Sequence, residues 1–265
     1  MTRLLLLSCI VLLTITGFYS CKKNKEAPLD LGYDYFPNKA GFYVVYDVDS
    51  LVYNNANLNP HTHLASVDTF RFQLKEKIES IYNDNLNRPT IRLERYVKLY
   101  NDTIPYSQMQ WTFRNVWAEN RTATTAEKVE ENTRYVKLVF PVKDNQTWNG
   151  NAQNTQPAMN YTYAYYDLPI KVRATSFDSV LQVTQLDDGG SILTQRQLYI
   201  EKYARNVGLV FKQIIDVQSQ PYVGWNSLPD SLYQDSTHAF LNKPILQRIT
   251  GGFQFTMTVN SYGTE

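Results

Sequence analysis

Hydrophobic and polar residues alternate along much of this chain with a period of two. In residues 67–82 the apolar side chains fall on one side of the pattern: Phe70, Phe72, Leu74, Ile78 and Tyr82. Residues 90–100 repeat the alternation with Ile91, Leu93, Val97 and Leu99. A period of two is typical of β-strands that bury one face. The pattern therefore predicts a mainly β fold.

Turn signals separate these runs. They are NDNLNRP at 83–89, NDTIP at 101–105 and DDGG at 187–190, the last of which predicts a β-hairpin. The connections are too short for crossover helices, so we expect about ten strands, mostly antiparallel. Few short helices are expected, with candidates only near 123–132 and 226–241.

The segment 144–157, rich in Asn, Gln, Gly and Pro, divides the chain near its middle. An aromatic-rich stretch opens each part, GFYVVYDVDS before it and YTYAYYDLPI after it. Two arrangements stay open. The chain forms either two β subdomains, 41–150 and 151–265, or one continuous domain, 41–265, built as an antiparallel meander in a long curved sheet or half-barrel.

The first twenty residues have the parts of an export signal. Arg3 is followed by an apolar run over 4–18 and by the small residue Ser20. This run is shorter than the roughly 20 apolar residues of a membrane span, which favours a cleaved signal peptide over 1–20. Cys21 follows, and the polar, proline-containing stretch to residue 40 predicts a flexible tether before a fold that starts near Gly41.

The stretch Phe18-Tyr19-Ser20-Cys21 resembles a relaxed bacterial lipobox. The resemblance implies cleavage before Cys21 and lipidation of its sulfur, with plain secretion as the alternative. A lipidated Cys21 would anchor the chain at the outer membrane, facing the periplasm or the cell surface.

The charge balance argues against nucleic acid as a partner. The 265 residues include 26 Lys and Arg and 25 Asp and Glu, and loss of Arg3 with the signal leaves 25 of each. Binding of phosphate backbones needs clustered positive charge, which a net charge of zero does not supply. Cys9 leaves with the signal, so a lipidated Cys21 leaves no thiol for catalysis or metal binding.

Motifs of known catalytic sites are missing from the sequence. It has no G-x-S-x-G elbow, no H-E-x-x-H helix and no glycine-rich phosphate loop. His61 and His63 in NPHTHL lie in a proline-containing loop without a further ligand nearby. We therefore expect no metal, no cofactor and no enzymatic activity.

Aromatic residues are the candidate ligand contacts. The chain has 20 Tyr, 12 Phe and 4 Trp, and two stretches are rich in them, MQWTFRNVW at 109–117 and NYTYAYYDL at 160–168. The candidates are Trp111, Phe113, Trp117, Tyr161, Tyr163 and Tyr165. Such rings either pack in the core or line an amphipathic groove, where ring faces contact apolar groups and hydroxyls meet polar ones.

Two further stretches, RYVKLVFPVKDNQTWNGN at 134–151 and EKYARNVGLVFKQ at 201–213, resemble an uncharacterised family of Gram-negative envelope lipoproteins. The resemblance implies a curved sheet similar to the half-barrel of lipoprotein-carrier proteins. It implies no activity. From the residues alone, Asn206 suits a left-handed turn position and Gly208 suits a close approach, which predicts a structural hairpin.

Two function classes follow. The first is a non-catalytic, membrane-anchored envelope lipoprotein that binds an apolar or amphipathic ligand, such as a lipid, or an envelope protein on its curved sheet. The alternative is a surface lipoprotein that binds or degrades glycans. An aliphatic lining of the concave face favours the first class, and exposed Trp and Tyr flanked by Asp, Asn and Arg favour the second.

Overall fold

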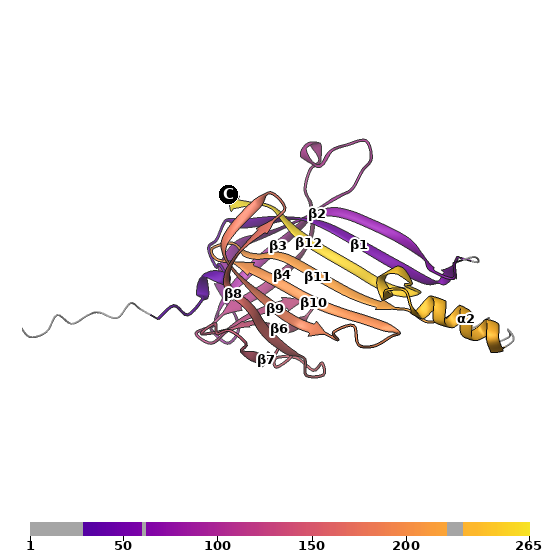
Figure 1. The fold of residues 1–265 in the computed structure, drawn as a ribbon. Coiled ribbons are helices and arrows are strands. Elements are labelled where there is room, and N and C mark those ends of the chain that lie inside the picture. The colour runs from indigo at the N-terminus through magenta and orange to yellow at the C-terminus, as the bar shows by residue number, and fades with distance from the viewer. Residues whose placement is uncertain (1–28, 60–61, 222–229) are drawn as a thin grey trace, which may run out of the picture. The chain divides into compact units, whose positions relative to one another are not determined.

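The structure, a computed structural model, describes residues 29–59, 62–221 and 230–265. The chain divides into a unit Met1–Asp30 and a compact unit Leu31–Glu265. The second unit contains one twelve-stranded antiparallel sheet and few helical turns (Figure 1). The predicted mainly β, antiparallel fold is therefore confirmed, with twelve strands in the described ranges instead of about ten.

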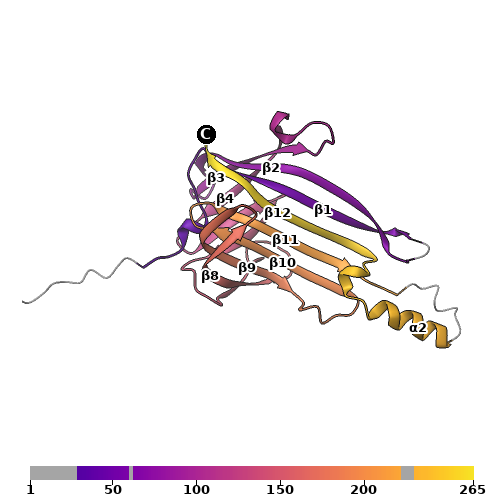
Figure 2. The same ribbon diagram turned by 45° about the horizontal axis from the view of Figure 1, so that its top comes forward.

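The strands are β1 (Phe42–Leu58), β2 (Ala65–Asn83), β3 (Pro89–Leu99), β4 (Thr112–Arg121), β5 (Thr125–Glu130), β6 (Thr133–Val139), β7 (Thr147–Asn149), β8 (Asn160–Val172), β9 (Thr175–Asp187), β10 (Gln195–Ala204), β11 (Gly208–Gln218) and β12 (Gly251–Thr264). The helical elements are η2 (Tyr33–Tyr35), η3 (Tyr106–Gln108), α2 (Asp230–Leu241) and η5 (Ile245–Gln247). Helix α2 lies beyond the ends of β10 and β11 (Figures 1 and 2). In the described part of the chain, no helix is long and apolar enough to cross a membrane.

The sheet is a meander in which the first strand pairs with the last. Its order is β6-β5-β4-β3-β2-β1-β12-β11-β10-β9-β8-β7, so other neighbours are consecutive in the chain. Strands β1 and β12 pair from Phe42 opposite Thr264 to Tyr53 opposite Gly252. Two six-stranded halves, β1–β6 and β7–β12, are thus joined at the middle of one sheet (Figure 2).

The sheet curls until its two edge strands, β6 and β7, approach each other. The backbone N–H of Val136 donates to the carbonyl of Gly150 at 2.9 Å. The Tyr163 hydroxyl accepts from the N–H of Val139 at 2.7 Å and donates to its carbonyl at 2.8 Å. The phenol thus replaces a missing strand neighbour, and the curved sheet that the sequence predicts is nearly closed, like a barrel.

The helix predicted over 123–132 is wrong. This segment forms β5, which pairs with β4 on one side and β6 on the other. Ala, Glu and Lys favour helices by intrinsic propensity, but pairing on both edges and burial of alternate side chains override that preference. The second predicted helix, 226–241, contains α2, and its first four residues lie outside the described ranges.

The compact unit starts at Leu31, earlier than the predicted start near Gly41. Tyr35 and Phe36, assigned to the tether by their proline-containing surroundings, are buried in a core with β6, β8 and β10. Arg121 donates to the carbonyls of Tyr33 and Phe36 at 3.2 and 3.0 Å. Residues 31–40 are therefore part of the fold, because their aromatic side chains pack into the sheet's inner face.

The hairpin predicted at YARNVGLV joins β10 to β11, with Ala204 opposite Gly208. Asn206 has a left-handed φ of 61°, and Gly208 has a φ of 86°. A Cβ on Gly208 would lie 3.0 Å from Cδ of Pro37. Glycine is thus required here for two reasons, its backbone conformation and the proline ring above it.

A comparison of Gly208→Val with Gly189→Val separates the cost of the left-handed backbone from the cost of the contact with Pro37. Gly189 has a φ of 66°, and a Cβ on it would meet nothing within 4 Å, so it carries the backbone cost alone. The left-handed cost is about 1–2 kcal/mol at either site, and overpacking against Pro37 adds about 1–3 kcal/mol only at Gly208. We expect thermal melts to show a drop several degrees larger for Gly208→Val. Equal drops would contradict the packing role of Pro37.

Candidate functional site

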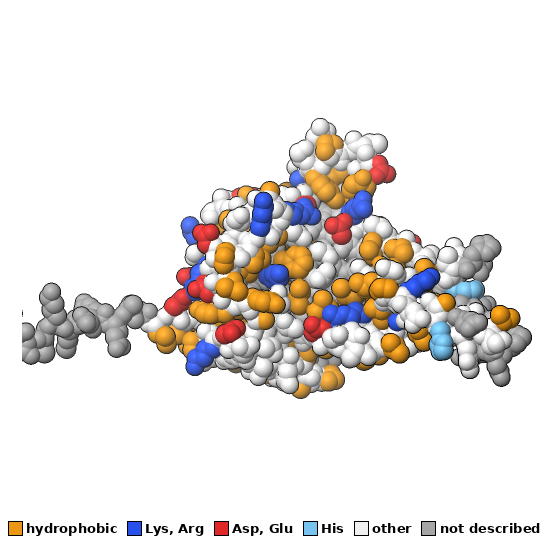
Figure 3. All heavy atoms as spheres, viewed as in Figure 1, with side chains coloured by type: hydrophobic (Ala, Val, Ile, Leu, Met, Phe, Trp, Pro, Cys, Tyr) orange, Lys and Arg blue, Asp and Glu red, His pale blue; other side chains and the backbone are white. Residues whose placement is uncertain are grey.

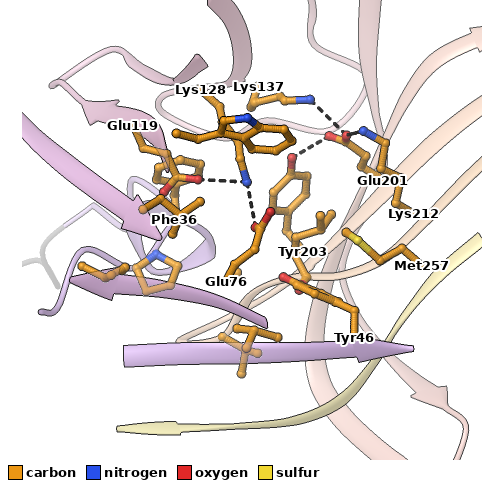
Figure 4. A pocket seen from close by; sticks show the side chains of 18 of the residues that line it. Phe36, Tyr46, Glu76, Glu119, Lys128, Lys137, Glu201, Tyr203, Lys212 and Met257 are labelled. Carbon is orange, nitrogen blue, oxygen red and sulfur yellow. Dashed lines mark hydrogen bonds and ion pairs between the residues drawn. The ribbon is translucent and has the colours of Figure 1, made fainter. Parts of the chain in front are cut away.

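The curled sheet holds a cavity of about 130 Å³ that is lined by two kinds of side chain (Figure 4). The apolar lining includes Phe36, Phe42, Val44, Ile78, Leu93, Val207, Leu209, Phe255 and Met257. The same cavity is lined by eight ionisable side chains, which we call the charged wall: Glu76, Arg95, Glu119, Lys128, Glu130, Lys137, Glu201 and Lys212. Four acids and four bases give the charged wall a formal charge of zero.

The alternation of the strands places these charges inside. Glu76 follows Leu74 and precedes Ile78 on the inward-facing side of β2, and both flanking residues are buried. Arg95 follows Leu93 in the same way on β3, and the two strands pair Glu76 with Arg95. Because a strand's side chains alternate between faces, a charge in an apolar row must enter the interior.

The first group of ion pairs centres on Glu76. Its two oxygens accept from Nε of Arg95 and Nζ of Lys128, each at 2.9 Å. Lys128 also lies 3.1 Å from Oε1 of Glu119. The Arg95 guanidinium lies 3.4 Å from the ring centroid of Trp117, which covers it on the inner face.

The second group centres on Glu201, which is only 1 % exposed. Lys137 and Lys212 approach its Oε1 at 3.1 and 3.0 Å, and the Tyr203 hydroxyl donates to Oε2 at 2.6 Å. Lys137 also pairs with Glu130 at 3.0 Å. Figure 4 shows these side chains converging from different strands on the carboxylate.

The pKa values show which carboxylates are held in their ionised form. Burial alone would raise the pKa of Glu130, but the nearby Lys137 and Lys212 outweigh it and lower the pKa to about 2. The same two lysines also hold the pKa of Glu201 well below its ordinary value against burial. Most of the charged wall is therefore stably ionised at neutral pH.

Glu119 is the exception on this wall. Burial raises the pKa of its carboxyl above the ordinary value of 4.5, and Lys128 only partly offsets this because Glu76 adds negative charge. A group whose pKa is raised by burial destabilises the fold when it ionises. Ionised Glu119 therefore costs stability on its own account, although it is an ion-pair partner of Lys128 at 3.1 Å.

The aromatic residues that the sequence predicts as ligand contacts lie in different parts of the structure. Trp117 lines the cavity. Tyr161 and Tyr163 are buried in the core beside Trp148, as in the packing alternative. Tyr165 is 64 % exposed, Trp111 lies under Lys98 outside the cavity, and Phe113 borders a separate groove. The candidates therefore do not form one site.

The charged wall itself was not predicted from the sequence. Its signal is present in β2 and β3, where Glu76 and Arg95 occupy positions that an apolar row would otherwise fill. Glu201 and Lys137 give no such signal, because only the curl of the sheet brings them together. In the described ranges no three His, Cys, Asp or Glu side chains group as a metal site. Cys21 and His61 lie outside those ranges.

In comparisons with known proteins, no family model, no curated protein and no solved structure matches this chain. The family resemblance therefore stays a prediction.

Glu119→Gln and Glu130→Gln should differ in their effect on stability at pH 7. The first removes a carboxylate whose ionisation destabilises the fold, so we expect an unchanged or higher melting temperature. The second removes a charged partner of Lys137, at a cost of about 1.5–3 kcal/mol or several degrees.

The pH dependence provides a further check on Glu130. Its pKa is lowered, so its contribution is complete above the ordinary value of 4.5 and is lost as the pH falls towards about 2. Thermal melts between pH 7 and pH 2 should show less acid destabilisation in Glu130→Gln than in the wild type.

A destabilised Glu119→Gln at pH 7 would contradict the role given to Glu119.

Proposed function

We propose that the protein is a lipid-anchored, non-catalytic envelope protein that binds an amphipathic ligand in the cavity of its curled sheet. One observation carries this proposal: apolar side chains and eight ionisable side chains line the same cavity. Ligand sites typically combine a mostly apolar lining with a few placed polar groups. An amphipathic molecule matches both parts of this lining.

Stability alone is a poor explanation for the charged wall. Replacing buried ion pairs by apolar side chains of similar volume is often neutral or stabilising, because desolvation offsets the attraction between the charges. The neighbouring core around Val48, Val180 and Val210 is packed with aliphatic side chains, so this fold can fill its interior that way. The ionisable residues are better explained by a partner that uses them.

The size of the cavity limits what enters it. An apolar cavity of about 150 Å³ holds a molecule such as benzene, so about 130 Å³ accommodates a ring or short branched group. Among the described residues Lys212 has one ion-pair partner, Glu201, which leaves N–H groups to donate. A ligand group that accepts from Lys212, or one that donates to Glu119, fits this arrangement.

A second candidate, glycan binding, is supported by an outer groove beside β3 and β4. It is lined by Ser80, Tyr82, Arg92, Asn115, Val116, Trp117, Ala118, Val129, Glu131 and Asn132. Tyr82 is 47 % exposed, and the amide and carboxylate side chains around it suit sugar hydroxyls. Trp117 lines this groove and the cavity, but its ring is already covered by Arg95, which makes it a weaker stacking platform.

The cavity proposal is tested with protein extracted from its own envelope and analysed by native mass spectrometry. We expect the wild type to retain a small molecule. Leu209→Trp fills the cavity from its apolar lining and should reduce the retained fraction at least tenfold. Leu86→Trp, at a turn position that is 72 % exposed, is the matched control and should retain it.

Glu119→Gln provides a second test in case Leu209→Trp does not fold, because this substitution changes the charge with almost no change of shape. It should weaken retention while keeping the fold. No bound molecule in the wild type, or equal retention in all variants, would contradict the cavity proposal. Retention of a saccharide that Tyr82→Ala abolishes would favour the glycan candidate.

The anchor rests on the lipobox resemblance at Cys21 and is tested separately. Labelling of growing cells with a palmitate analogue should mark the wild type and not Cys21→Ser, because the thiol is the acylation site. Cys9→Ser is the control, since Cys9 lies inside the predicted signal, and it should stay labelled. A labelled, membrane-bound Cys21→Ser variant would contradict lipid anchoring.

A further inference from the structure

A second groove, of about 830 Å³, is lined by residues of β1, β2, β3, β4 and β12. Its lining is Ser50, Thr69, Phe70, Arg71, Phe72, Val97, Leu99, Tyr100, Phe113, Arg114 and Phe255. Phe255 is the one residue of this lining that also lines the cavity. This volume lies in the range of about 300–1,000 Å³ that is typical of small-molecule sites.

The floor of the groove is unusually apolar for an exposed surface. Leu99 is 69 % exposed, and Phe70 and Phe113 are each more than half exposed. Phe72 lies directly opposite Leu99 on the neighbouring strand and packs against the core. Exposed apolar side chains that line a groove are a feature of binding sites.

The charge of the groove has one sign. Arg71 and Arg114 line it, and none of its described lining residues is acidic. Arg71 pairs at 3.3 Å with Asp49, which lies outside the lining. No ion pair engages Arg114 within the described ranges, and its guanidinium carbon lies 5.8 Å from the ring centroid of Phe72. A cation without a carboxylate partner thus stands over an aromatic floor.

We propose that this groove binds a single-chain anionic amphiphile, with its alkyl chain on Phe70, Phe72 and Leu99 and its acidic head at Arg114. An alkyl chain removes the exposed floor from water, which is the main favourable term. A carboxylate offers two oxygens to the guanidinium fork, which gives charge-assisted and geometrically matched hydrogen bonds. The site is independent of the cavity ligand proposed above.

An anionic membrane surface is a poorer occupant than a single molecule. Recognition of anionic lipid surfaces by charge typically uses clusters of about 4–8 Lys and Arg, whereas two arginines line this groove. The apolar floor also includes Phe72 and Phe255, which are partly buried against the core. A flat bilayer surface does not reach side chains at that depth. Figure 3 shows hydrophobic side chains with Lys and Arg among them on one face of the molecule.

Isothermal titration with dodecanoate tests the proposal, using residues 21–265 with Cys21→Ser, which contain the whole compact unit. We expect saturable binding below the concentration at which dodecanoate forms micelles. Arg114→Gln should weaken it at least tenfold, because the charge-assisted bond is lost. Arg92→Gln, an arginine outside this groove, should leave it within twofold.

Substitutions of two leucines of similar exposure test the site proposed for the alkyl chain. Leu99→Asn, at 69 % exposed, should weaken dodecanoate binding at least tenfold, and Leu86→Asn, at 72 % exposed, should not change it. Neither change disturbs a buried position, so both variants should fold. Dodecyltrimethylammonium, with the same chain and a cationic head, should bind the wild type more weakly than dodecanoate does.

Three results would overturn the proposal. The first is equal binding of dodecanoate by wild type, Arg114→Gln and Leu99→Asn. The second is binding that Leu209→Trp abolishes and the groove variants do not, which would place the amphiphile in the cavity. The third is Arg114-dependent sedimentation with phosphatidylglycerol vesicles but not with phosphatidylcholine vesicles, in the absence of dodecanoate binding, which would assign the groove to a membrane surface.

Discussion

Ion pairs cross the interior of the sheet, and they can form only because the sheet is curled. Strands β2 and β5 are three strand spacings apart, about 14 Å in a flat sheet, yet Nζ of Lys128 lies 2.9 Å from a carboxylate oxygen of Glu76. Lys137 on β6 reaches Glu201 on β10, in the other half of the meander, at 3.1 Å. Desolvated charges need partners, so these contacts require the curved sheet, and the curved sheet brings the edge strands close enough for Tyr163 to join them.

A space lies beside these charges. The paired carboxylates and ammonium groups line a cavity of about 130 Å³ together with apolar side chains. Glu119 shows the tension most clearly, because its burial and the neighbouring Glu76 both oppose its ionisation. A fold that keeps such a group gives up stability at that position, and a ligand that contacts the carboxyl would restore it.

The sequence predicts the strands well because alternation is local. The runs at 67–82 and 90–100 became β2 and β3, and Asn206 and Gly208 became the turn that was expected. The helix over 123–132 was wrong because its composition favours helix while pairing on both edges decides its structure. The charged wall was missed for a related reason. Contacts such as Lys137 with Glu201 join residues 64 positions apart, and no local pattern encodes their approach. Burial of Tyr35 and Phe36 likewise depends on the sheet they pack against.

A crystal structure of the protein isolated from its own envelope without added amphiphile would test the central claim most directly. We expect electron density for a bound molecule in the cavity, in contact with its apolar lining and with at least one residue of the charged wall, and with the ion pairs of Glu76 and Glu201 intact. A cavity that holds only ordered water hydrogen-bonded to those charges would contradict it, because the charged wall would then be satisfied without a ligand.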